Sequence, residues 1–120
     1  MILFDNQTYR ALRNGMDMAW MQQQVHSNNI ANSETPNYKN KTIEFKKVLQ
    51  KAENGQSAKW VQKAVITSDE STASRLDGNN VNTEQEELGL WQAYAQYSAL
   101  TQRLSGKLST LSYVINNTAK

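Results

Sequence analysis

The residues of this chain that could carry chemistry are few and scattered. The one histidine, His26, has no cysteine and no second histidine in the 120 residues to complete a metal-ligand set. The lack of cysteine also excludes disulfide bonds and a thiolate nucleophile. Three acids that could bind a cation, Glu84, Glu86 and Glu87, lie where a helix is expected to begin, and there they complement its positive end. We therefore expect no metal, no cofactor and no catalytic residue, and we interpret His26 as a structural histidine on the core side of a helix.

A basic segment with aromatic residues is the second candidate for chemistry. Residues 39–63 hold seven lysines against two acids and include Phe45 and Trp60. Lysines for phosphate and aromatic rings for stacking are what a nucleic-acid site requires. Residues 69–87, however, hold six acids against one arginine, and the whole chain carries only +2. Nucleic-acid binding is therefore the less favoured alternative, and the two segments could instead pair with each other, within or between subunits.

Two long helices are expected at the ends of the chain, over 5–32 and 83–117. Both carry apolar residues at three- and four-residue spacing, and in the second helix this spacing is typical of a coiled-coil seam. Thr83 as N-cap, with Glu86 three residues later, predicts where the second helix begins. The expected seam residues are Leu12 and Met16 in the first helix and Leu90, Tyr94, Tyr97, Leu104, Leu108, Leu111 and Ile115 in the second.

The middle of the chain changes character at Pro36, which cannot continue a helix. Thr35 to Tyr38 predicts a β-turn with Pro36 second and Asn37 third, where asparagine tolerates the left-handed backbone of a type II turn. Residues 43–52 predict a short amphipathic helix. Alternating apolar residues from 60 to 66 predict a strand of about seven residues that could pair as a hairpin.

The expected fold class is therefore mainly α, with long terminal helices forming a coiled-coil-like hairpin around a small middle segment that is partly β or irregular. The expected parts are an N-terminal helix within 1–35, a turn and middle insertion over 36–82, and a C-terminal helix within 83–120. No apolar run approaches the roughly 18 residues that a membrane span needs.

The outer faces of both helices carry amides and hydroxyls where exposed helix faces usually carry Lys and Glu. Asn, Gln, Ser and Thr make up 43 of the 120 residues, and no charged residue occurs from Leu88 to Gln102. Cores of protein interfaces are depleted in charge because desolvating a charge is costly. We interpret these faces as packed, one within the subunit and one between subunits; a glutamine-rich solvent face is the alternative.

The segment Asn29 to Lys39, NIANSETPNYK, closely resembles the NIANxxTPGYK signature of bacterial flagellar rod, hook and hook-associated proteins. Within that family the short length and the segment DGNNV, Asp77 to Val81, are similar to a proximal rod protein; the sibling FlgC type is the alternative. Asn37 stands where the family has glycine, at little expected cost to the turn. The positions that carry the resemblance, and that we expect to form an assembly motif, are Asn29, Ile30, Ala31, Asn32, Thr35, Pro36, Asn37, Tyr38, Asp77, Gly78, Asn79 and Val81.

The resemblance implies a structural subunit and not an enzyme. Its terminal helices would order on assembly and pack as a coiled coil in a drive shaft that transmits motor torque. The chain would leave the cytoplasm through the flagellar type III export apparatus and lie in the basal body, which is in the periplasm of a two-membrane cell. The implied partners are further copies of itself, FlgC-type rod subunits, the membrane ring and a FliE-type adaptor, with no nucleic acid and no direct membrane insertion.

Overall fold

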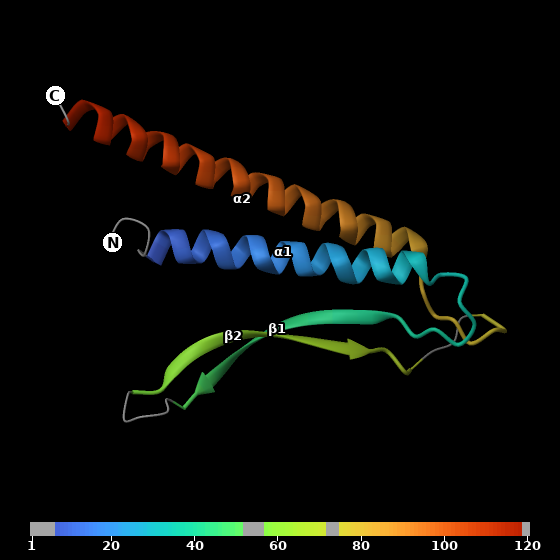
Figure 1. The fold of residues 1–120 in the computed structure, drawn as a ribbon. Helices are drawn as coiled ribbons and strands as arrows, with labels where there is room; N and C mark the ends of the chain where they lie inside the picture. The colour runs from blue at the N-terminus through green and yellow to red at the C-terminus, as the bar shows by residue number, and fades with distance from the viewer. Residues whose placement is uncertain (1–6, 52–56, 72–74, 119–120) are drawn as a thin grey trace. The chain divides into compact units, whose positions relative to one another are not determined.

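The computed structural model describes residues 7–51, 57–71 and 75–118. The chain divides into two compact units, which we call the helical unit (Met1–Gln23 with Leu88–Lys120) and the hairpin unit (Gln24–Glu87). The elements in chain order are α1 (Gln7–Ala31), β1 (Lys41–Gln50), β2 (Lys59–Ser68) and α2 (Thr83–Thr118) (Figure 1). This arrangement confirms the mainly helical fold class. No helix within the described residues is long and apolar enough to span a membrane.

In the helical unit, α1 and α2 run antiparallel and bury a narrow contact made largely of small residues (Figure 1). Leu12 and Ala19 of α1 and Ala93 of α2 are buried. A Cβ atom at Gly15 would lie only 3.0 Å from Cδ1 of Leu100, so the missing side chain makes room for the leucine. Because small side chains bury little apolar area, this contact contributes only modestly to the stability of the unit.

Much of the apolar surface of α2 stays exposed. The Trp91 side chain is 70% exposed, and its ring meets Tyr94 edge to face with centroids 6.2 Å apart. The contact line with α1 runs through Ala93 and Leu100, at one edge of the expected seam. Among the expected seam residues Leu12 is buried; Met16, Leu90, Tyr97, Leu104 and Leu111 are half-buried; Tyr94, Leu108 and Ile115 are exposed.

The short helix expected over 43–52 is wrong, because β1 occupies residues 43–50, Lys51 follows the strand and residue 52 lies outside the described residues. β1 pairs antiparallel with β2 from Lys41 opposite Ser68 to Gln50 opposite Lys59. Ile43 and Phe45, with their partners Ile66 and Ala64, form an apolar stripe on one face. A ten-residue segment is too short to be stable as an isolated helix, so cross-strand pairing outweighs its helical pattern. The strand expected near 60–66 is confirmed and forms a hairpin with β1.

The N-cap of α2 is Asn82, not Thr83 as expected. Asn82 Oδ1 accepts a hydrogen bond from the Gln85 backbone N–H (3.4 Å), which leaves Thr83 as the first helical residue. Glu86 does not close a capping box, because its carboxylate is engaged by His26 and Asn29 instead. Glu84 and Glu86 in the first turn still complement the helix dipole.

The two helical glycines provide a matched test of the α1–α2 contact. Nothing lies within 4 Å of a Cβ built at Gly106, so Gly106→Ala should stabilise the chain by about 0.5–1 kcal/mol through helix propensity alone. Gly15→Val should destabilise it by about 1–3 kcal/mol, because the added methyl groups displace Leu100. The midpoints of thermal unfolding, followed by circular dichroism, measure both changes. Equal behaviour of the two variants would argue against a close approach at Gly15.

Candidate functional site

Asn29 is the centre of a polar junction in the hairpin unit. Its side chain is fully buried, with 0% exposed. Its Nδ2 donates to the Lys41 carbonyl (2.7 Å) and to Glu86 Oε2 (3.0 Å). Its Oδ1 accepts from the Lys41 backbone N–H (3.0 Å) and from the Tyr38 hydroxyl (3.2 Å). Both protons and both lone pairs of the amide are therefore used, and Asn29 joins the end of α1, the start of β1 and the start of α2.

Glu86 is a buried carboxylate with two donors. His26 Nδ1 donates to Glu86 Oε2 at 2.6 Å, and Asn29 Nδ2 donates to the same oxygen. Because an ionised carboxylate only accepts, this pairing assigns the proton to Nδ1 of the histidine. His26 thus has a structural partner, as the sequence predicted. Burying Glu86 is tolerable because its charge is hydrogen-bonded and lies at the positive end of α2.

Asn79 is the second fully buried amide, and it fixes the loop that precedes α2. Its Nδ2 donates to the carbonyls of Asn32 and Thr35, both at 2.9 Å. Its Oδ1 accepts from the Val81 backbone N–H (2.9 Å), and its own N–H donates to Asp77 Oδ1 (3.1 Å). Asn79 therefore supplies donors to carbonyls that follow the end of α1, where the helix can no longer satisfy them.

The β-turn expected at Thr35 to Tyr38 is confirmed. The Tyr38 backbone N–H donates to the Thr35 carbonyl (3.3 Å), and Asn37 has a φ of 62°, as a type II turn requires at its third position. The Asn37 N–H donates to the Asp77 carbonyl (2.8 Å), so the turn lies against the loop before α2. Gly78 has a φ of +82°, and a Cβ there would lie 2.5 Å from Asn37 Oδ1. Gly78 is therefore needed both for its backbone angle and for space.

Two basic side chains tie the same loop to its neighbours. Arg75 Nη1 donates to the Ser33 carbonyl (2.7 Å) and lies 3.6 Å from a carboxylate oxygen of Glu34. Lys39 Nζ donates to the Gly78 carbonyl (2.8 Å). Backbone carbonyls that carry a cationic donor are held more strongly than those facing water, so these contacts order the loop.

The base of the hairpin is held by a further pair of asparagines. The Asn40 N–H donates to Asn80 Oδ1 (2.6 Å), and Asn80 Nδ2 donates to the Asp69 carbonyl (2.8 Å). The Asp69 backbone N–H donates to the Asn40 carbonyl (2.8 Å). This bond extends the hydrogen bonding between the two strands by one step at the base of the hairpin. Asn80 thereby links the start of β1 to the residue that follows β2.

Tyr38 is held protonated at the junction. Burial raises the pKa of its hydroxyl above the usual value of 10.0, and the nearby Glu86 carboxylate raises it further. The neutral hydroxyl is the form that donates to Asn29. Because the pKa is raised on folding, this contribution to stability is complete at neutral pH and is lost only as the pH rises through the raised value.

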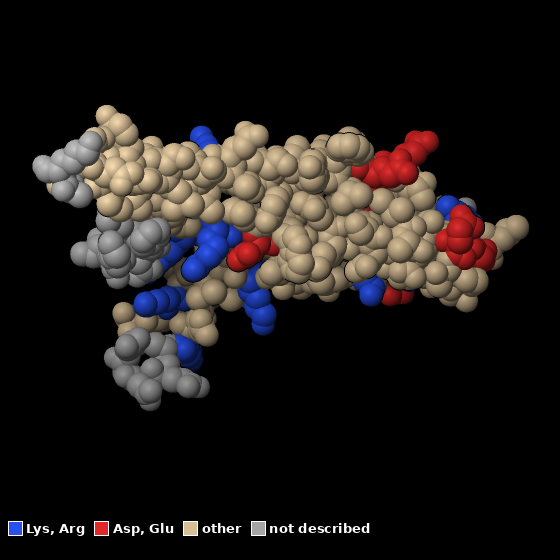
Figure 2. Space-filling view, turned by 45° about the horizontal axis from the view of Figure 1, so that its top comes forward, with Lys and Arg blue, Asp and Glu red and all other residues tan. Residues whose placement is uncertain are grey.

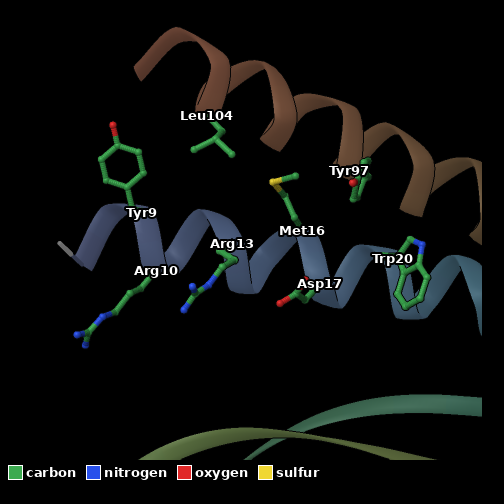
Figure 3. A pocket seen from close by; sticks show the side chains of 8 residues that line it. All are labelled: Tyr9, Arg10, Arg13, Met16, Asp17, Trp20, Tyr97 and Leu104. Atoms are coloured by element: carbon green, nitrogen blue, oxygen red, sulfur yellow. The ribbon is translucent and has the colours of Figure 1, made fainter. Parts of the chain in front are cut away.

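The arrangement is suited to holding backbone segments together, and its polar groups are already committed to that task. Within the described residues no group of three or more His, Cys, Asp or Glu could hold a metal ion. A separate groove of about 370 Å³ lies in the helical unit. There Tyr9, Met16 and Leu104 point into the space between α1 and α2, whereas Arg10 and Arg13 point away from α2 (Figure 3). Its titratable groups do not converge on one point.

The structure brings together most of the positions in the expected assembly motif. Hydrogen bonds or backbone contacts join Asn29, Asn32, Thr35, Asn37, Tyr38, Asp77, Gly78 and Asn79. Val81 is buried, Ile30 is half-buried, and Ala31 and Pro36 are exposed. A role of these positions in assembly stays a prediction, whereas their role in building one junction follows from the contacts.

Several residues that hold this region together were not among the expected motif positions: His26, Lys39, Asn40, Arg75, Asn80 and Glu86. The signal for Glu86 was its spacing. It stands seven residues before Ala93, and Ala93 seven before Leu100, so the three share one face of α2. An acid on the buried face needs a donor, and His26, three residues before Asn29, lies one turn away from it on α1.

Comparison with known proteins gives two matches. The family described as "Flagella basal body rod protein" matches residues 10–39, which include most of α1 and the turn. The flagellar basal body rod protein FlgB of Bacillus subtilis (strain 168) is 34% identical over 119 residues, covering 90% of this chain and 92% of that protein. The similarity to that protein therefore extends over both units.

Asn29→Asp tests the central amide. The change replaces two donors with acceptors, leaves the Lys41 carbonyl without its donor and puts a second carboxylate beside Glu86. We expect the free energy of unfolding, measured in urea, to fall by about 2–4 kcal/mol. Glu86→Gln in the same chain supplies a new amide donor and should recover part of the loss. Additive losses in the double variant would contradict this geometry.

Gly78→Ala tests the contact between the turn and the loop before α2. The left-handed backbone costs an alanine about 1–2 kcal/mol, and the clash with Asn37 Oδ1 adds to that cost. In an Asn37→Gly background the clash is absent, so the same substitution should cost less unfolding free energy. A double-mutant cycle measures this coupling. Equal costs in both backgrounds would separate the turn from the loop.

Proposed function

This chain belongs to the flagellar basal body rod protein family and is a structural subunit of the rod, of the FlgB rather than the FlgC type, and we propose that its terminal helices join it to neighbouring subunits of a drive shaft that transmits motor torque. A rod subunit assembles with other components of the basal body. The specific neighbours that we propose are further copies of this chain, FlgC-type rod subunits, the membrane ring and a FliE-type adaptor.

The observation that carries the proposal is the exposed apolar surface of the terminal helices. Large side chains that are exposed include Trp20 on α1 and Leu88, Trp91 and Tyr113 on α2. No charged residue lies between Leu88 and Gln102 to keep this surface in water. Large exposed apolar patches mark interaction sites. A helical unit with a narrow internal contact and a wide apolar exterior has more to bury against neighbours than it buries alone.

We propose that the seam residues serve this assembly in two ways. The half-buried ones, such as Tyr97 and Leu104, pack within the subunit and at the edge of its neighbour. The exposed ones, such as Tyr94, Leu108 and Ile115, pack against the neighbour alone. The uncharged Gln and Ser positions around them fit a contact in which amides find partners more cheaply than charges do.

The junction in the hairpin unit has a different part in the proposal. It sets where the chain leaves α1 and enters α2, so that both terminal helices can be presented to neighbours. The polar groups at its centre bond to the protein itself, which supports a structural role without catalysis. We further propose export through the flagellar type III apparatus and a position outside the cytoplasmic membrane, in the periplasm where a cell has two membranes.

A clean deletion of the gene tests the function. We expect a non-swimming strain whose basal bodies, seen by electron microscopy, have membrane rings but no rod or hook, and we expect the intact chain to restore both. A deletion strain that swims with complete flagella would remove the proposal.

Trp91 offers a test of the helix surface with a matched control. Because the side chain is largely exposed, Trp91→Glu should change the free energy of unfolding of the isolated chain by no more than about 0.5 kcal/mol. In the deletion strain the same variant should fail to restore swimming, since assembly would bury an unpaired charge. Trp91→Phe keeps an apolar ring and should restore most swimming. Full motility with Trp91→Glu would exclude this surface from the rod contacts.

A further inference from the structure

Lysines outnumber acids on the outer half of the hairpin within the described residues. Five lysines lie on it within the described residues: Lys46, Lys47, Lys51, Lys59 and Lys63. One of them, Lys46, has a carboxylate nearby, Glu44 at 3.4 Å, and both of these side chains are well exposed. An exposed pair of this kind contributes little, so the hairpin keeps a clear positive excess.

The register of the hairpin places two of these lysines directly against each other. Lys46 is the cross-strand partner of Lys63. Like charges directly opposite on a sheet are destabilising, so this pair weakens the hairpin in which it lies. A two-stranded hairpin is already marginal in water, which makes the repulsion harder to tolerate. A carboxylate from another molecule would reduce the repulsion between the two lysines, so the pair is suited to bind one.

The same half of the hairpin exposes apolar cross-strand pairs. Trp60 is 70% exposed and stands opposite Leu49, which is 50% exposed. Val48 and Val61 are opposite each other on the other face and are also exposed. Exposed apolar side chains with lysines beside them are suited to bind a protein surface that combines acidic and apolar side chains.

The hairpin unit also carries an acidic surface, at the other end of its strands. Its exposed members are Asp69, Glu70, Asp77, Glu84 and Glu87. The first cross-strand pair of the ladder, at the base of the hairpin, is Lys41 with Ser68. The last pair, Gln50 with Lys59, lies nine residues further along β1. At about 3.3 Å per residue that separation spans roughly 30 Å. Figure 2 shows Asp and Glu in several red patches, most of them apart from the blue side chains that lie near the lower grey segment, whereas one red patch borders blue side chains.

The two charged surfaces do not meet within one copy. Among the described residues the carboxylate partners of cationic or imidazole groups are Glu44, Glu34 and Glu86, and none joins a hairpin lysine to the acidic surface. Glu70, Glu84 and Glu87 have no ion-pair partner in that part of the chain. Opposite surfaces of nearly equal charge, held apart by the length of a hairpin, are suited to pairing between copies.

We propose that the outer half of the hairpin of one copy docks on the acidic surface of a second copy. The lysines at 46 and 63 would face carboxylates at 84 and 87, and the Val48–Val61 pair, which lies on the same face of the hairpin as these lysines, would be covered by the contact. The contact is head to tail, because two different surfaces meet, and such contacts extend along a ring or a helix. It rests on the proposed function, since a rod subunit needs contacts of this kind beyond those of its terminal helices.

Charge complementarity favours a second copy over a nucleic acid. The acidic surface would repel phosphates, and the chain as a whole carries only +2. Each copy carries both the lysines and the acidic surface, so the two partners of the contact are always present in equal number. Nucleic-acid binding by the hairpin is accordingly an outcome that the experiment must be able to show.

The absence of cysteine in the chain makes cross-linking the direct test. One full-length copy carries Gln50→Cys, an exposed position on the same hairpin face as Lys46 and Lys63, and a second copy with a different tag carries Gln85→Cys beside the two glutamates. Mixed under mild oxidation, they should form a disulfide-linked dimer of unlike copies. The paired change Lys46→Glu and Lys63→Glu on the first copy should slow this cross-linking at least tenfold. It keeps like charges opposite each other, so thermal unfolding should change little.

The reciprocal change decides the assignment. Glu84→Lys with Glu87→Lys on the second copy should restore cross-linking to the reversed hairpin. The proposal would be overturned if cross-linking is not restored by these two changes, or if Lys46→Glu with Lys63→Glu leaves the rate of cross-linking unchanged. Loss of cross-linking in the presence of a stoichiometric oligonucleotide bound by the hairpin lysines would also overturn it. The cross-linking assay uses purified protein, so its result is independent of the swimming of the deletion strain, which tests the rod function.

Discussion

The structure of the hairpin unit depends on one buried amide. Asn29 lies at the point where α1, β1 and α2 approach one another, and its four hydrogen bonds use every donor and acceptor it has. A buried amide with an unmet bond would cost about 1–3 kcal/mol, so the surrounding groups have little freedom to move away. The buried carboxylate of Glu86, its histidine partner and the protonated Tyr38 are all arranged around this requirement.

The buried polar side chains and the narrow apolar contact between helices belong to different units. In the hairpin unit the buried residues include three polar side chains, Asn29, Asn79 and Glu86, so that direction and register come from hydrogen bonds. In the helical unit the buried contact is narrow, and several large apolar side chains, such as Trp20, Trp91 and Tyr113, are exposed. A subunit built this way holds its turn geometry by itself and leaves much of the apolar surface of its helices exposed. This division agrees with membership of a family of rod subunits.

Local chemistry made part of this structure predictable. Proline and asparagine at fixed places in Thr35 to Tyr38 define the turn, and long runs of three- and four-residue spacing define both helices. The β1 strand was missed because its residues also fit a short amphipathic helix, and its partners lie 9 to 27 residues further along the chain. The interpretation of Glu86 as an acid that complements the helix dipole holds, but its pairing with His26 was missed because the histidine is 60 residues distant. The strand and the His26–Glu86 pair were missed for the same physical reason: each depends on a partner that is distant in the sequence, and local preferences alone are weak.

The claim that buried asparagine side chains fix the hairpin unit is tested most directly by native-state hydrogen exchange. The backbone N–H of Lys41 donates to Asn29 Oδ1, and that of Val81 donates to Asn79 Oδ1. If the junction is as rigid as these bonds require, both amides exchange as slowly as the neighbouring amides of α1. Exchange of Lys41 and Val81 at the rate of an open loop, while α1 stays protected, would contradict the claim.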